Sequence, residues 1–183
     1  MKIRETPLFG VSVVESDSFN DHRGAFTRLF CSEELRPILG QRSVVQINQS
    51  RTHAIGAVRG MHYQATPYAE MKLVRCLRGR VWDVALDLRA GSPTLLQWHG
   101  EEISAENARM IVIPEGCAHG FQVLEPNSEL LYLHTMNYTP VAEAGVRFND
   151  SLADIRWPLA AVDLSLRDLQ HALLDADFTG IQV

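Results

Sequence analysis

Short runs of β-branched residues, interrupted by turn residues about every ten positions, constrain the fold of this chain most strongly. The runs at 110–113, 120–124 and 130–135 are separated by Pro114-Glu115-Gly116 and Glu125-Pro126-Asn127. Strands this short and this regularly interrupted are typical of a β-sandwich or barrel rather than a βαβ fold. We therefore expect an all-β protein.

Alternation and turn residues predict two hairpin-like features. Residues 72–77 and 81–88 flank Arg78-Gly79-Arg80, and the second run alternates, so we expect a hairpin with one face in the core. Asp21-His22-Arg23-Gly24 predicts a tight turn just before Phe26.

Helix is expected to be minor. Ser32 with its following acids predicts a short helix, limited by Pro37 and Gly40. Ser165 predicts the start of a second helix at about 166–174, within a C-terminal flap at 158–183. Its packing residues would be Leu166, Leu169, Leu173 and Leu174. No repeat, linker or low-complexity segment interrupts residues 1–183, so a single domain is expected.

Charge and composition exclude several classes of partner. The 183 residues carry a net charge of −5, which argues against binding to nucleic acid or to an anionic membrane surface. No apolar leader or membrane-length run is present. Cys31, Cys76 and Cys117 lack CxxC spacing, so reduced thiols in the cytoplasm are the simplest expectation.

The basic residues are unevenly distributed, and this predicts a small bound anion such as a phosphate. Between positions 51 and 80 one acid, Glu70, accompanies six bases. The alternative is a set of solvated side chains on strand edges. The six bases are Arg51, Arg59, Lys72, Arg75, Arg78 and Arg80.

The stretch from Gln46 to Gln64 combines amides, arginines and histidines with small and β-branched residues. This composition suits the lining of a pocket better than a core strand. Val45 and Ile47 alternate with Gln46 and Asn48, as in a half-buried strand with one polar face.

His62 is the candidate base within this stretch, because histidine is the usual base near neutral pH. Strict alternation would separate Arg59 from His62, so both reach one pocket only if Gly60 bends the chain. A single histidine on a strand is more often structural, and both interpretations stay open at this point.

Four other residues have a functional and a structural interpretation. His119 follows a turn and could bind phosphate or cap that turn. Lys72 begins an apolar strand face, where it either extends to the rim or holds a ligand oxygen. Tyr132 fits a core tyrosine, and Asp168 fits an S-x-x-D capping box after Ser165.

A metal-dependent β-barrel enzyme is one alternative, because His62, Glu70 and His119 loosely resemble histidine and carboxylate ligands of a metal ion. Gln64 stands where a second histidine would complete an H-x-H pair, and Lys72 would repel a cation. We therefore expect no metal. No G-x-S-x-G elbow, G-x-G-x-x-G or P-loop is present for hydrolysis or a nucleotide cofactor.

Nearly the whole chain resembles one family. The chain closely resembles the dTDP-4-dehydrorhamnose 3,5-epimerase family in motifs that occur in order and together are far more specific than any single pattern. These motifs are DHRGAF, QINQS, AVRGMHYQ, KLVRCLRGRVWDVALDLRAGSPT, IPEGCAHGFQVL, YLHTMNYTPVAEAGVRFND, IRWP and LSLRD.

The resemblance implies a cupin-like jelly roll, a homodimer that exchanges N-terminal strands within residues 1–30, and cofactor-free, metal-free chemistry on a nucleotide-linked 4-keto-6-deoxy sugar. His62 would remove a proton from C3 or C5, with Asp168 holding its imidazole. Lys72 would stabilise the enolate oxygen, and Tyr132 would be the acid on the opposite face.

The resemblance also implies substrate-binding residues. Arg23, Arg59 and His119 would hold the diphosphate. Contacts to the nucleotide or the sugar are expected from Phe26, Gln46, Asn48 and Tyr138.

The chain departs from the family at Arg28, where the usual RGxFxE pattern has a glutamate that helps to hold the thymidine. A guanidinium only donates hydrogen bonds, so GDP or CDP, and a heptose, stay open as alternatives.

Overall fold

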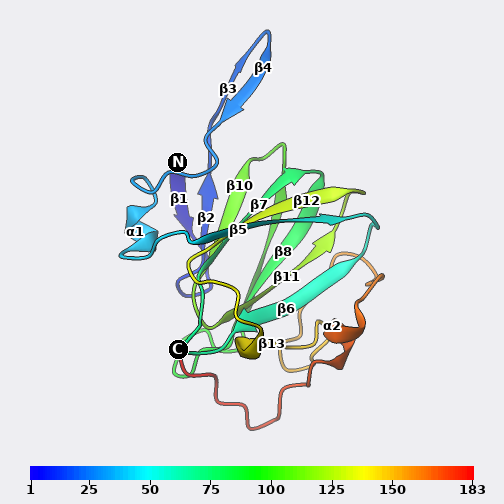
Figure 1. Ribbon diagram of the computed structural model, residues 1–183. Coiled ribbons are helices and arrows are strands. Elements are labelled where there is room, and N and C mark those ends of the chain that lie inside the picture. Colours follow the sequence, from blue (N-terminus) through cyan, green and yellow to red (C-terminus); the bar gives the residue numbers. More distant parts are fainter.

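The computed structural model describes residues 1–183 and consists of two antiparallel β-sheets that face each other (Figure 1). The six-stranded sheet has the order β1 (Lys2–Glu5), β2 (Ser12–Glu15), β10 (Arg109–Ile113), β7 (Lys72–Arg78), β12 (Ser128–His134), β5 (Gln46–Thr52). The five-stranded sheet has the order β13 (Glu143–Gly145), β6 (Val58–Gln64), β11 (Cys117–Val123), β8 (Arg80–Asp87), β9 (Trp98–Ser104). The expected all-β jelly-roll sandwich is confirmed.

Three hydrophobic clusters hold these layers together. The largest lies between the sheets and includes Val74 and Ile111 from one sheet and Val81 and Phe121 from the other. A second cluster covers the outer face of the six-stranded sheet, where Leu39 of α1 (Arg36–Leu39) packs. The third covers the outer face of the five-stranded sheet with residues that follow β13. The alternating strands therefore bury apolar side chains on both faces.

The predicted strands at 110–113, 120–124 and 130–135 are confirmed as β10, β11 and β12, but the predicted hairpin at 72–88 is wrong. β7 and β8 belong to different sheets, so the chain crosses between the sheets at Gly79. Gly79 has a φ of +74°, and a Cβ there would lie 2.5 Å from Ser128 Oγ. Its glycine geometry serves a sheet-to-sheet crossing instead of a hairpin turn.

The first predicted helix begins later than expected. Residues around Ser32 form a turn, and α1 begins at Arg36, with Pro37 in its first turn. Proline fits that position because its missing N–H is not needed there. Pro37 therefore opens the helix instead of limiting it.

The C-terminal helix is shorter than expected and buries a different residue. α2 spans Leu166–Gln170, Ser165 Oγ accepts the Asp168 backbone N–H, and His171 is already extended. The buried residue is Asp168, whereas Leu166 is 77% exposed. Leu169 and Leu173 are also exposed, and only Leu174 of the four predicted leucines packs against a core cluster.

Two other features differ from expectation. β5 is an edge strand, and its apolar residue Ile47 is 60% exposed, as is the preceding Val45 at 52%. No element covers the face that carries Val45 and Ile47. The prediction that this apolar face is buried is therefore wrong. β9 was not predicted from the sequence.

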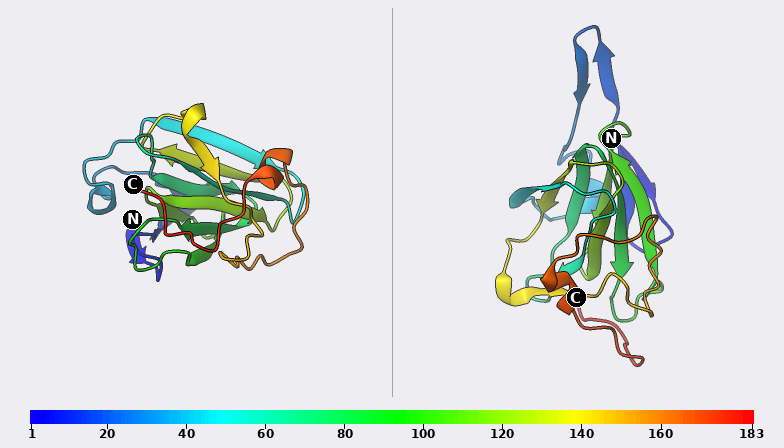
Figure 2. Two further views of the ribbon diagram at one scale, coloured as in Figure 1. Left: turned by 90° about the horizontal axis from the view of Figure 1, so that it is seen from below. Right: turned by 90° about the vertical axis from the view of Figure 1, so that its right-hand side faces the viewer.

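The turn predicted at residues 21–24 is confirmed and joins β3 (Ser18–Asp21) to β4 (Gly24–Thr27). This hairpin, here named the N-terminal arm, projects away from both sheets (Figures 1 and 2). Phe19 and Phe26 are cross-strand partners in the arm, at 72% and 71% exposure. No helix in the structure has the length and hydropathy needed to cross a membrane.

Candidate active site

A polar cavity of about 490 Å³ lies between the two sheets, and both contribute side chains to it. Most of its lining residues are polar or charged. The cavity brings together eight of the residues predicted from sequence: Asn48, Arg59, His62, Lys72, His119, Tyr132, Tyr138 and Asp168.

Gly60 allows Arg59 and His62 to share this cavity. It has a φ of +134°, and a Cβ there would lie 2.5 Å from the Cα of Gly120 on β11. The pairing of β6 with β11 shifts register between His119 and Phe121, beside this close approach. The bend inferred at Gly60 from the sequence is therefore present.

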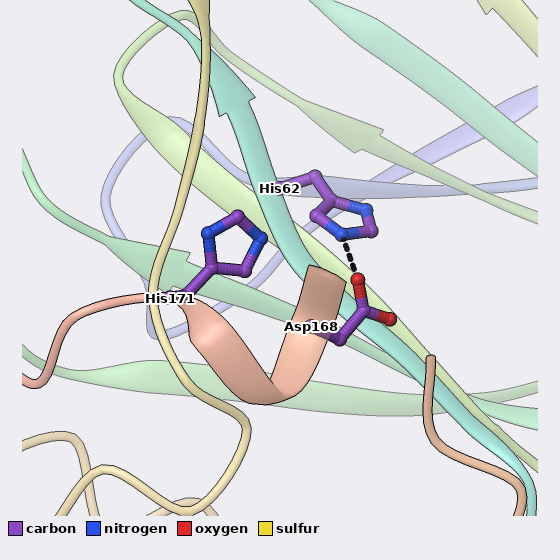
Figure 3. A group of neighbouring side chains, drawn as sticks. All are labelled: His62, Asp168 and His171. Carbon is purple, nitrogen blue, oxygen red and sulfur yellow. Dashed lines mark hydrogen bonds and ion pairs between the residues drawn. The ribbon is translucent and has the colours of Figure 1, made fainter. Parts of the chain in front are cut away.

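His62 and Asp168 form the central pair of the cavity (Figure 3). His62 Nε2 lies 2.8 Å from Asp168 Oδ1, and the backbone N–H of Gly60 donates to Asp168 Oδ2 at 3.4 Å. Burial acts to raise the pKa of Asp168, but the hydrogen bond and charge of His62 lower it to about 2. An ionised carboxylate only accepts hydrogen bonds, so Nε2 carries the proton and Nδ1 of neutral His62 keeps its lone pair.

Asp168 therefore combines both of its sequence interpretations. Its backbone N–H donates to the capping Ser165 Oγ at 3.0 Å, while its carboxylate leaves the helix to meet His62. The carboxylate is 3% exposed. The predicted cap by Ser165 is confirmed, whereas the carboxylate expected to complete the capping box bonds His62 and Gly60 instead.

Two residues missed as functional candidates surround the His62–Asp168 pair. Arg167 Nη2 lies 3.4 Å from His62 Nε2, and its Nη1 donates to Glu143 at 2.8 Å. His171, which ends α2, places its ring 5.6 Å from the His62 ring, edge to face (Figure 3). Partial burial, and then the charge of His62, lower the pKa of His171.

Lys72 is held inside the cavity and does not extend to the rim. Its Nζ lies 3.1 Å from Glu70 Oε1 and donates to the backbone oxygen of His62 at 3.1 Å. The other Glu70 oxygen is 2.7 Å from His134 Nδ1. Burial raises the pKa of Glu70, but His134 and Lys72 together lower it below its ordinary value. Glu70 thus pairs with the buried Lys72 amine next to His62.

Tyr132 stands on the opposite sheet from His62. Its hydroxyl is 3.0 Å from Ser50 Oγ, and burial raises the pKa of the phenol strongly. The hydroxyl is therefore protonated throughout the neutral range, as a proton donor must be.

His119 has a buried partner, Asp83, that was not predicted from the sequence. Its Nε2 lies 3.0 and 2.9 Å from the two oxygens of Asp83, a fully buried carboxylate on β8. Burial raises the pKa of Asp83, and His119 opposes that effect. An acid at an inward position between Val81 and Ala85 was the signal that could have revealed it.

The three residues weighed as metal ligands have separate partners. His62 pairs with Asp168, Glu70 with Lys72 and His134, and His119 with Asp83. The structure does not assemble them into one ligand set.

The basic cluster predicted from residues 51–80 is only partly a cavity feature. Arg59 and Lys72 line the cavity, and Arg59 forms no ion pair. Three of the others fit the alternative of solvated side chains on strands, whereas Arg75 fits neither interpretation. Arg51 and Arg78 pair with Glu129, Arg80 pairs with Glu102 and Glu125, and Arg75 is buried within its sheet.

Gln46 supports the cavity from behind. Its Oε1 accepts the backbone N–H of Tyr138 at 3.0 Å, and it does not line the cavity itself. The Tyr138 hydroxyl donates to Glu143 at 2.8 Å, a contact that raises the pKa of this tyrosine.

Arg23, Phe26 and Arg28 do not line the cavity of their own chain. Arg23 lies at the tip of the N-terminal arm and pairs with Asp21. Arg28 pairs with Glu34, which also binds the N-terminal ammonium of Met1.

Comparisons with known proteins agree with the resemblance found in the motifs. The family model described as dTDP-4-dehydrorhamnose 3,5-epimerase matches residues 5–176. The dTDP-4-dehydrorhamnose 3,5-epimerase of Pseudomonas aeruginosa is 44% identical over 180 residues, which is 97% of this chain and 98% of that protein.

Solved structures give the same result. The dTDP-6-deoxy-D-glucose-3,5-epimerase of Legionella pneumophila, in complex with dTDP-4-keto-L-rhamnose, superposes with a TM-score of 0.91 at 37% identity, covering 100% of this chain and 98% of that one. A 3'-monoepimerase of Streptomyces bikiniensis, in complex with dTDP-quinovose, has a TM-score of 0.86 at 31% identity, covering 93% and 86%.

Proposed function

This chain belongs to the dTDP-4-dehydrorhamnose 3,5-epimerase family, and from that premise we propose that it epimerises a 4-keto-6-deoxy sugar carried on a nucleoside diphosphate. The reaction inverts C3, C5 or both, and it needs no cofactor. The observation that carries the proposal is the placement of His62 with Asp168 on one side of the cavity and of Tyr132 and Lys72 on the other.

The first step is proton removal by His62. The C4 ketone makes the hydrogens on C3 and C5 acidic because it accepts the electron pair as an enolate. His62 Nδ1 takes the proton, and the resulting imidazolium is stabilised by Asp168 through the 2.8 Å contact at Nε2. Lys72, which pairs with Glu70, stabilises the negative oxygen of the enolate.

The second step returns a proton from the other face. Tyr132 belongs to the six-stranded sheet and His62 to the five-stranded sheet, so their side chains enter the cavity from opposite walls. The phenol gives its proton to the enolate carbon and the ketone reforms, which inverts the centre. Solvent then restores the proton to Tyr132 and removes the one held by His62.

Diphosphate binding is assigned to the open basic end of the cavity. Arg59 has no ion pair, so its guanidinium is free to bind phosphate oxygens. His119, whose Nε2 is held by Asp83, lines the same cavity and would donate to a phosphate oxygen through Nδ1 when both of its ring nitrogens carry a proton. Asn48 and Tyr138 would contact the nucleotide or sugar, and Gln46 supports Tyr138.

We further propose a homodimer in which each chain lends its N-terminal arm to the other. Two observations support this: the exposed Phe19–Phe26 pair on the projecting arm, and the exposed apolar face of edge strand β5 beside the cavity. A second copy would cover both surfaces. It would also bring Arg23, Phe26 and Arg28 to the cavity of its neighbour. We place the enzyme in the cytoplasm, where Cys31, Cys76 and Cys117 stay reduced.

Isotope exchange tests the proposed reaction. In D₂O the enzyme should introduce deuterium at C3 or C5 of a nucleotide-linked 4-keto-6-deoxy sugar, measured by NMR or mass spectrometry. His62→Ala should abolish exchange, whereas His53→Ala, an exposed histidine that pairs with Asn127, should keep it. Absence of exchange with dTDP-, GDP- and CDP-linked sugars would contradict the proposal.

A further inference from the structure

We propose that His62, Asp168 and His171 form a binding site for a divalent transition-metal ion such as Zn²⁺, and that the ion switches the enzyme off. One donor atom from each of these residues lies within 4.8 Å of the others (Figure 3). The set differs from the His62, Glu70 and His119 combination considered from the sequence. Binding itself is independent of the proposed reaction, and only the inhibition rests on it.

The chain places the three donors on two elements. Asp168 and His171 are three residues apart at the end of α2, so one helical turn directs both toward the same side. His62 comes from β6, which packs against α2. Two imidazoles and one carboxylate are the donor set of many zinc sites that keep a fourth position open.

His171 carries a nitrogen that the fold leaves unused. Its Nε2 is buried and has no hydrogen-bond partner. Buried polar atoms without partners are rare in native proteins, so such an atom calls for an explanation. A Cβ on Gly145 would lie 2.5 Å from this nitrogen, so glycine at that position gives the imidazole its room beside His62.

The distances suit one ion after small side-chain rotations. Zinc binds nitrogen and oxygen at about 2.0–2.2 Å, so three donors around one ion lie ~3–4 Å apart. His62 Nε2 and Asp168 Oδ1 are already 2.8 Å apart, and the ion would replace the proton between them. The opposing charge is Arg167, whose Nη2 lies 3.4 Å from His62 Nε2. Its side chain is 55% exposed and pairs with Glu143, so it can move away from a bound ion.

Inhibition follows from the ligands themselves. An ion on Nε2 withdraws electron density from the His62 ring, so Nδ1 becomes a poorer base. The same ion takes Asp168 away from its role in stabilising the imidazolium. Removal of the ion with a chelator should restore both functions.

Zinc titration of the purified protein against a fluorescent chelator tests the site directly. Wild-type protein should bind one equivalent of Zn²⁺, and His171→Ala should weaken binding about tenfold or more. His171→Leu, which keeps most of the volume without a nitrogen, should do the same. His53→Ala should bind like the wild type. Failure of the wild type to bind Zn²⁺, or binding as tight as the wild type's in both His171 variants, would overturn the site.

Deuterium exchange then tests the inhibition separately. Zn²⁺ should suppress exchange by wild-type protein and by His53→Ala, EDTA should restore it, and His171→Ala should resist the ion. If Zn²⁺ binds through His171 but does not slow exchange, the proposed inhibition by the ion is overturned. If no nucleotide sugar exchanges at all, the proposed reaction fails, and the titration alone still decides whether the metal site exists.

Discussion

His62 on β6 and Asp168 on α2 are 106 residues apart in the chain and meet at 2.8 Å in the cavity. The Asp168 carboxylate is 3% exposed, and its backbone N–H is fixed by Ser165. The imidazole is therefore oriented by the carboxylate of a residue whose own backbone N–H is capped by Ser165 at the start of a short helix. This arrangement makes the roles of cap and catalytic carboxylate separable by mutation.

Asp168→Asn should lower the rate of deuterium exchange by about 10²–10⁴-fold, because an amide neither stabilises the imidazolium nor selects the Nε2 tautomer as well. Ser165→Ala is the matched variant, since it removes the capping oxygen and keeps the carboxylate. It should lower the stability of the protein by about 1 kcal/mol with a much smaller loss of exchange. Similar exchange rates in the two variants would mean that the Asp168 carboxylate has no role in exchange beyond the capped turn.

The same carboxylate should make stability depend on acid pH. Its pKa is about 2 in the folded protein against an ordinary 3.8, so the unfolded chain binds this proton more readily. The stabilisation is complete above about pH 4 and is lost as the pH falls toward 2, a change of about 2 kcal/mol. Urea unfolding of wild type and Asp168→Asn across this range measures it. If the free energy of unfolding falls with pH equally in wild type and Asp168→Asn, the lowered pKa of Asp168 is contradicted.

The fold was predictable where local pattern decides it. Alternation and turn residues gave most of the strands, because both depend on neighbours in sequence. Sheet membership depends on contacts far along the chain, and Gly79 illustrates the difference. Its glycine fits a hairpin turn and a crossing between sheets equally well, so only the partners of β7 and β8 distinguish them.

The sequence indicated which residues could belong to the site, but not which of them contact each other. The residues alone indicated His62 as a possible base and Asp168 as a cap, and the family motifs joined them. Asp83 went unrecognised because its partner His119 lies on another strand. Glu70 was considered only as a metal ligand, and its second partner, His134, lies far along the chain on β12. His171 was missed because no local pattern places the end of α2 beside β6.

Tyr132→Phe should separate proton removal from inversion. His62 and Asp168 remain in place, so deuterium should still enter the substrate from the His62 side. Return of a proton from the other face should slow by about 10²–10⁴-fold, because the phenol is the donor there. NMR of the product sugar distinguishes exchange from inversion. Tyr68→Phe, outside the cavity, is the control, and equal loss of exchange and inversion in Tyr132→Phe would contradict the assignment.

Thermal-shift screening should identify the nucleotide. A ligand that binds only the folded state stabilises it, by about 2.7 kcal/mol at a hundredfold excess over Kd. We expect dTDP to raise the Tm more than GDP, CDP or UDP, because Arg28 is neutralised by Glu34 and so need not exclude thymidine. A larger shift with GDP or CDP would instead make Arg28 a determinant of a different nucleotide.

Mixing two inactive variants should reveal whether the N-terminal arm serves the neighbouring chain. Arg23→Ala removes the cation at the arm tip, and His62→Ala removes the base. If arms are exchanged, a mixed dimer contains one cavity with both an intact base and an intact arm. Random mixing after mild unfolding and refolding should then restore roughly a quarter of wild-type sites. Light scattering should report a dimer for each variant and for the mixture. An arm that serves its own chain leaves the mixture as inactive as its components, and a monomeric wild-type protein would remove the basis for exchange.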